Sequence, residues 1–168
     1  MKKALLLIGF IIYMTFPVAQ ENAPVATDIS AEAIRQFIDG LPRDAVSDRA
    51  IRVVEVTGDY RVGVYGVYRP QAFPGDANLH EVNTTEIYYM LKGSATLVTG
   101  GQMVEPYRPE PTSTSLRAPS IVGGVSRKLV PGDVVIIPGH TPHWWSELET
   151  DIEYLIFRPD PDNRLRIQ

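Results

Sequence analysis

The stretch GDVVIIPGHTPHWW, Gly132 to Trp145, contains two of the three histidines of the chain, His140 and His143. Its valine and isoleucine run, residues 134–137, predicts a strand, and the Pro-Gly pair that follows predicts a tight turn. His143 then begins a second run with strand character. The stretch therefore predicts two strands joined by a turn, with an imidazole as the first side chain of the second strand.

The composition indicates one globular domain built mainly from strands. The chain has 168 residues, of which 44% are hydrophobic and 21% are charged, an ordinary balance for a compact domain. Its 13 glycines, 14 prolines and 8 tyrosines favour short strands joined by tight turns over a helical bundle. We therefore predict an all-β domain.

Residues 1–20 are similar to a secretory signal peptide. Lys2 and Lys3 precede an apolar run over residues 4–16, which is too short to span a bilayer comfortably. Cleavage near Ala19 or Gln20 would release the mature chain, and an uncleaved membrane anchor is the alternative. The segment predicts a periplasmic or secreted protein, without stable membrane insertion after processing.

Charge and cysteine content exclude several kinds of partner and site. The net charge is −4, and removal of the N-terminal lysines makes it more negative, so nothing favours binding to nucleic acid or anionic lipid. The chain has no cysteine, which excludes disulfides and thiolate metal ligands. Any metal ligands must therefore be histidines and carboxylates.

Residues 21–49 are expected to form a linker and one short amphipathic helix. Apolar side chains recur at helical spacing from Ile29 to Ile38, Asp28 or Ser30 is positioned to cap the start, and Gly40 marks the end. Residues 50–168 are expected to form the β-barrel domain.

Short runs separated by turn residues predict the strands of that domain. The expected strands are IRVVEV, YRVGVYGVYR, TEIYYML, SATLVT, VVIIP, HWWSEL and IEYLIFR. With no helical run between them, they favour an antiparallel sandwich or barrel. The stretch 105–124 is rich in Pro, Ser, Thr and Gly and is expected to be a long loop, either a lid or a surface excursion.

The third histidine belongs to the stretch HEVNTTEIYYMLKG. His80, Val82, Glu86, Tyr88 and Met90 share one parity, so a continuous strand would place them on one face. A buried carboxylate is costly unless it is paired, protonated or bound to a cation. Glu86 is therefore a candidate partner for His80.

These two stretches resemble the paired motifs of the cupin superfamily. The first motif is a histidine, one residue, a second histidine, three or four residues, a glutamate, six residues and a glycine, and His80, Glu86 and Gly93 fall on this spacing. Val82 replaces the second histidine. In the second motif, Gly132, Pro138 and His143 match in register. There, His140 replaces the motif glycine and Glu147 replaces the asparagine.

The resemblance, which covers roughly residues 60–158, implies a cupin-type double-stranded β-helix, also called a jelly-roll barrel, with a short N-terminal helix. It also implies a divalent metal ion, either Fe, Mn or Zn, bound by His80, Glu86 and His143. Two imidazoles and one carboxylate suit these metals and leave coordination positions open. Val82 has no donor atom for a fourth ligand, and Glu81, one residue away, is the less favoured substitute.

Four further residues are candidates for the same cavity, besides Val82. His140 and Tyr88 are candidate catalytic groups for proton transfer, although a turn histidine is more often only solvated. Met90 and Trp145 are candidate cavity-lining residues, and plain packing is the alternative for aromatic side chains in a barrel. The alternative for His143 is a histidine buried in the core with its hydrogen bonds made inside the protein.

The resemblance implies a metal-binding cupin that acts on a small molecule, for instance in a dioxygenase-type reaction, with isomerase and lyase chemistry equally compatible. A non-catalytic binding or sensing module, favoured by Val82, and a metal-free carbohydrate isomerase are the alternatives. A homodimer is expected as well, through edge strands or the helix at residues 28–40.

Overall fold

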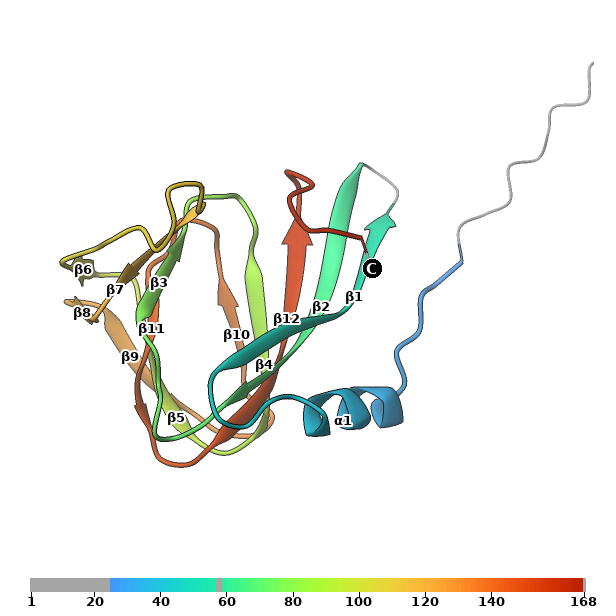
Figure 1. Ribbon diagram of the computed structural model, residues 1–168, viewed down its shortest axis with the longest axis horizontal. Helices are drawn as coiled ribbons and strands as arrows, with labels where there is room; N and C mark the ends of the chain where they lie inside the picture. The colour runs from blue at the N-terminus through green and yellow to red at the C-terminus, as the bar shows by residue number, and fades with distance from the viewer. Residues whose placement is uncertain (1–24, 57–58, 168) are drawn as a thin grey trace, which may run out of the picture.

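The computed structural model describes residues 25–56 and 59–167, and it shows two five-stranded antiparallel sheets that face each other (Figure 1). Sheet A has the order β1-β2-β12-β4-β10 and sheet B the order β7-β3-β11-β5-β9. The elements are α1 (Ala31–Asp39), β1 (Ser47–Val56), β2 (Tyr60–Arg69), β3 (Ala77–His80), β4 (Glu86–Lys92), β5 (Ala95–Thr99), β6 (Gln102–Val104), β7 (Ser115–Ala118), β8 (Ser120–Val122), β9 (Val125–Leu129), β10 (Val134–Ile137), β11 (His143–Leu148) and β12 (Ile152–Asp160).

Strands that are distant in sequence alternate within each sheet. β12 lies between β2 and β4 in sheet A, and β11 lies between β3 and β5 in sheet B. The prediction of an all-β jelly-roll barrel with a short N-terminal helix is therefore confirmed. All seven expected strands are present, whereas β3 and β6–β9 were not predicted. β1 begins at Ser47, ahead of the expected start, because it continues to pair with β2 there.

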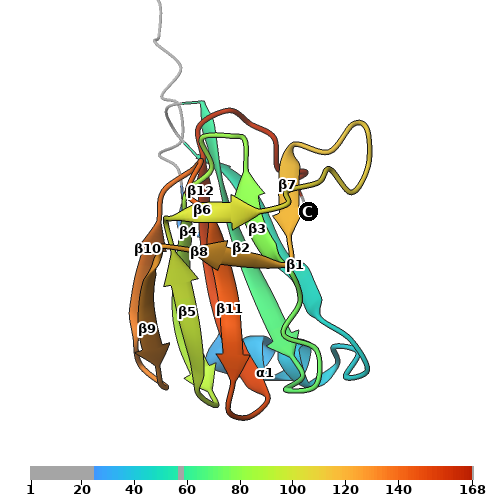
Figure 2. The same cartoon turned by 90° about the vertical axis from the view of Figure 1, so that its left-hand side faces the viewer.

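The prediction of a long loop at residues 105–124 is wrong, because β7 and β8 lie within it. β7 extends sheet B by pairing with β3, and Ser115 lies opposite His80 in this register. β8 pairs with β6, and this ribbon crosses the outer face of sheet B (Figure 2). Local composition pointed to a loop because the pairing that forms these strands is made with distant parts of the chain.

The core lies between the two sheets, and the helix covers sheet A from outside. The inner cluster includes Val67, Met90, Leu97, Trp145, Tyr154 and Ile156, all almost inaccessible. Ser30 caps α1 by accepting a hydrogen bond from the Ala33 amide at 3.1 Å, as predicted. Ile38 of α1 and the following Leu41 then pack against Tyr68 and Leu155 on the outer face of the sheet.

The predicted signal peptide, residues 1–20, lies outside the described residues. Within the residues that are described, no helix has both the length and the apolar character needed to cross a membrane. Export, the domain limits and the homodimer stay predictions.

Candidate metal centre

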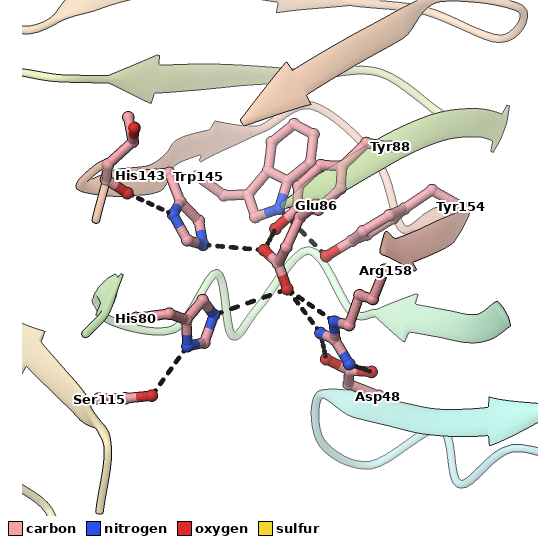
Figure 3. A network of polar contacts seen from close by, with 10 residues as sticks. Asp48, His80, Glu86, Tyr88, Ser115, His143, Trp145, Tyr154 and Arg158 are labelled. Carbon is pink, nitrogen blue, oxygen red and sulfur yellow. Dashed lines mark hydrogen bonds and ion pairs between the residues drawn. The ribbon is translucent and has the colours of Figure 1, made fainter. Parts of the chain in front are cut away.

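Three side chains from the two sheets meet at one end of the barrel. His80 ends β3 and His143 begins β11, both in sheet B, whereas Glu86 begins β4 in sheet A. One potential ligand atom of each residue lies within 4.8 Å of the other two. Figure 3 shows the three side chains directed toward one another. The three residues that the motifs selected therefore converge.

His80 and Glu86 meet by a route that differs from the prediction. The alternation argument placed them on one face of a continuous strand, but β3 ends at His80 and β4 begins only at Glu86. The two strands belong to opposite sheets. The residues therefore meet across the barrel interior, and the residues between them, including Val82, form the connection between the sheets.

The turn between β10 and β11 carries the chain from sheet A to sheet B and delivers His143. The His140 amide donates a hydrogen bond to the His80 carbonyl at 3.0 Å, so the turn is tied to the end of β3. His140 has φ 61°, in the left-handed region that favours glycine. A glycine at this position would adopt the same φ without steric cost. The His140 side chain is exposed and is not part of the three-residue cluster.

We expect the free energy of unfolding of His140→Gly to exceed that of His140→Ala by about 1 kcal/mol, because only glycine adopts this φ without steric cost. Chemical denaturation of the two variants measures the difference. Equal stabilities would contradict the assigned turn conformation.

Glu86 is buried, and both of its carboxylate oxygens have polar partners. Its side chain is 3% exposed, and Arg158 donates from Nε to Oε1 at 2.8 Å and approaches the same oxygen with Nη2 at 2.8 Å. The Tyr88 hydroxyl donates to Oε2 at 3.0 Å. Burial alone would raise the pKa of Glu86, but Arg158, His143 and His80 outweigh it and hold this pKa at about 2. Glu86 is therefore a carboxylate at neutral pH.

Both imidazoles present Nε2 to this carboxylate. His143 Nε2 lies 3.4 Å from Oε2, and His80 Nε2 lies 3.6 Å from Oε1. On the other side of each ring, His143 Nδ1 lies 3.0 Å from the Thr141 carbonyl and His80 Nδ1 lies 2.8 Å from Ser115 Oγ. Burial lowers the pKa of His80 to about 4, despite the raising effect of Glu86, so this ring is neutral at pH 7.

This arrangement fits a metal ion. A carbonyl oxygen only accepts hydrogen bonds, so His143 Nδ1 carries a proton, and Nε2 is the nitrogen that faces the Glu86 carboxylate. A metal ion placed between Nε2 and the carboxylate would be bound by both groups. Metal-bound histidines commonly have their second nitrogen fixed in this way by a carbonyl or another polar partner. His80, Glu86 and His143 therefore form a suitable donor set for Fe(II), Mn or Zn.

Several solved structures are similar to this chain, all at low sequence identity. No protein-family model matches the chain, and no curated protein matches it. Among solved structures, the DMSP lyase DddQ from Ruegeria pomeroyi DSS-3 has 14% sequence identity and a TM-score of 0.49, over 90% of this chain and 83% of that chain. An RmlC-like cupin family protein with a double-stranded beta-helix fold from Methanocaldococcus jannaschii has 15% identity and a TM-score of 0.42, over 72% and 88%.

A third solved structure, the ectoine synthase from P. lautus, has 12% identity and a TM-score of 0.47, over 82% of this chain and 80% of that chain. With identities this low and TM-scores below 0.5, these likenesses assign nothing to this chain. What assigns the fold is the chain's own strand order, with β11 and β12 each inserted between earlier strands, and the convergence of His80, Glu86 and His143 from both motifs at one end of the barrel. The fold is that of the cupins.

In this cupin fold, His80 and Glu86 line a small open cavity, whereas His143 is buried and is not part of the cavity wall. The cavity has a volume of about 280 Å³, and it is lined by Asp48, His80, Val82, Thr84, Glu86, Thr114, Arg158 and Leu165. Val82 occupies the motif position of the second histidine and contributes only methyl groups to the wall. The cavity therefore offers room for a small molecule on the side where a fourth protein ligand is missing.

The other predicted residues are placed as follows. Glu81 is exposed and pairs with Arg108 at 2.7 Å, away from the cluster. Met90 and Trp145 are 1% and 3% exposed and belong to the inner core, so they support the site without lining the described cavity. Trp145 stacks on Tyr88 with ring centroids 6.1 Å apart. Burial and the charge of Glu86 raise the pKa of Tyr88, so its hydroxyl acts as a donor at neutral pH.

Arg158, Asp48 and Ser115 were missed by the sequence reasoning. Arg158 also pairs with Asp48, at 2.7 Å from Nη2, which links β12 to β1 (Figure 3). A signal for Arg158 was present, because it continues the alternation of the inward-facing Ile152, Tyr154 and Ile156. Ser115 was hidden by the prediction of a loop, and no local pattern distinguishes Asp48.

Proposed function

We propose that the protein is a metal-dependent cupin that acts on a small molecule in the cavity beside His80, Glu86 and His143. The observation that carries this proposal is the convergence of two imidazole Nε2 atoms on one buried carboxylate, within 4.8 Å. The open cavity supplies space for the substrate next to these ligands. A metal bound there supplies a Lewis acid with open coordination positions for an oxygen-bearing group of the substrate.

The residues of the chain divide the remaining tasks. His80 and His143 are held in orientation by Ser115 and the Thr141 carbonyl. Arg158 and Tyr88 fix the carboxylate of Glu86, and so leave one lone pair of Oε2 directed toward His143. Isomerase and lyase reactions are compatible with this set, because a metal held by these ligands could act as a Lewis acid alone. A dioxygenase-type reaction is compatible as well, and it would also need O2 and a redox-active metal such as Fe(II).

A non-catalytic binding module is the second candidate, and one observation favours it. The ion pair of Glu86 with Arg158 already satisfies the buried carboxylate without a metal ion. In such a module, the cavity would hold a small molecule by its polar wall alone.

Metal analysis separates the two candidates. We expect the purified protein to contain about one divalent metal ion per chain, and His80→Ala and His143→Ala to lower the affinity by more than about a hundredfold, since even an outer partner is worth 10–100-fold. Elemental analysis and titration of chelator-treated protein measure both quantities.

His140→Ala is the matched control for these variants. It removes the one remaining histidine of the chain, which lies in the turn just before His143 but outside the cluster. We expect it to retain the metal. Equal loss of metal in His140→Ala and His143→Ala, or a wild-type protein that binds no metal after reconstitution, would contradict the proposed metal centre.

A further inference from the structure

A second, larger pocket adjoins the cavity of the candidate metal centre. Its volume is about 550 Å³, and it is lined by Phe37, Asp48, Arg49, Ala50, Tyr65, Arg164, Leu165 and Arg166. Asp48 and Leu165 line both this pocket and the cavity beside Glu86. The two spaces are therefore neighbours that share a wall.

Three arginines give this pocket a positive charge. Arg49 comes from β1, and Arg164 and Arg166 come from the segment after β12. Across residues 25–56 and 59–167, no carboxylate forms an ion pair with any of the three. The cluster contrasts with the net charge of −4 of the whole chain.

Asp48, the acidic side chain in the pocket wall, is paired with Arg158, which it shares with Glu86. Asp48 accepts hydrogen bonds from Arg158 at 3.3 and 2.7 Å, so its charge is shared with a guanidinium on the cavity side. The Arg158 guanidinium also lies 4.0 Å from the ring centroid of Tyr65, which forms part of the pocket wall. Asp48, Glu86 and the Arg158 that they share carry one negative charge together. The charge of Arg164 also contributes to lowering the pKa of Asp162. The three arginines therefore leave the pocket positive on balance.

The backbone that carries two of these arginines is anchored on both sides of Leu165. The Leu165 amide donates to the buried carboxylate of Asp160 at 2.7 Å, and Arg61 donates to the Leu165 carbonyl at 2.6 Å. The Leu165 side chain lies over Gly63, where a Cβ atom would approach it to 2.9 Å. Arg164 and Arg166, on either side of Leu165, are therefore presented from a fixed point next to the cavity.

We propose that Arg49, Arg164 and Arg166 form a subsite for an oxyanion group of the substrate, either a carboxylate or a phosphate. This inference rests on the proposed function, because the reacting part of the same molecule would occupy the cavity at His80, Glu86 and His143. Arginine binds planar oxyanions with paired, charge-assisted hydrogen bonds, which fits this role. The substrate class is then a small anionic molecule long enough to pass Asp48 and Leu165.

The test measures oxyanion binding in the absence of metal, because phosphate would also bind a metal ion. Chelator-treated full-length protein is titrated with inorganic phosphate and, separately, with succinate at low ionic strength, and binding is followed by calorimetry and amide chemical shifts. We expect binding with shifts near residues 49 and 164–166. The double variant Arg164→Gln/Arg166→Gln should weaken binding by at least about tenfold. Arg49→Gln, which removes the arginine contributed by β1, should weaken binding as well.

Arg52→Gln is the matched control, because Arg52 is an exposed arginine of the same strand that does not line the pocket. Equal weakening in Arg52→Gln, or no binding of either anion to the wild-type protein, would overturn the subsite. The preferred anion identifies the acidic group. If the protein binds metal but neither anion, the subsite alone is refuted. If the protein binds an anion but never binds metal, the proposed metal centre alone is refuted.

Discussion

Replacing Arg158 with methionine is expected to lower the free energy of unfolding of the metal-free protein by about 3 kcal/mol or more. Arg158 makes two close contacts with Glu86 Oε1, both at 2.8 Å, and the Glu86 side chain is 3% exposed. Without the guanidinium, a buried carboxylate loses its main compensating charge, which costs more than the loss of an exposed pair. Urea denaturation of chelator-treated protein measures the change.

A double-mutant cycle identifies the origin of this loss. Glu86→Gln should cost less than Arg158→Met, because Arg158 keeps Asp48 as a partner. The double variant should be more stable than the sum of the single effects predicts, with a coupling of about 1–3 kcal/mol. Arg52→Met, which removes an exposed arginine from β1, should change little. Additive effects within about 0.5 kcal/mol would show that the two side chains do not interact as described.

The sequence predicted which residues converge at the site better than it predicted how the fold brings them together. The motif spacing selected the three residues that converge, and periodicity with turn residues found the strands that carry Glu86 and His143. It could not reveal that His80 and Glu86 lie on opposite sheets, because that depends on how β3 and β4 pair with strands far along the chain. The strand that holds Ser115 was missed for the same reason, since its local composition is that of a loop.

The partners of Glu86 show a related limit. A buried carboxylate had to be paired, protonated or bound to a cation, and that requirement is met by Arg158, 72 positions away in sequence. Alternation along β12 marked Arg158 as inward-facing, but its partner depends on the closure of sheet A. The left-handed conformation at His140 likewise became visible only in the folded turn. Motif spacing therefore gives residue identities, and tertiary pairing gives their environment.

Replacing Gly93 with alanine is expected to destabilise the protein by about 4 kcal/mol, an exceptionally large effect for one methyl group. Gly93, the glycine of the first cupin motif, joins β4 to β5 with φ 78°. A Cβ atom there would collide with the Asp151 carbonyl oxygen and lie 2.7 Å from Thr150 Oγ1. Backbone strain and this collision add together, and neither is relieved by a side-chain rotation, because the Asp151 oxygen belongs to the backbone.

Gly100→Ala is the matched control, because Gly100 has φ 70° but nothing within 4 Å of the added Cβ atom. It should show the conformational cost alone, about 1–2 kcal/mol. Thermal and urea denaturation of both variants measure the difference, which reports the collision at Asp151. Since Gly93 lies at the opposite end of β4 from Glu86, the variant should lose stability while the folded fraction keeps its metal affinity. Equal losses in the two variants would contradict the close approach of Gly93 to the turn before β12.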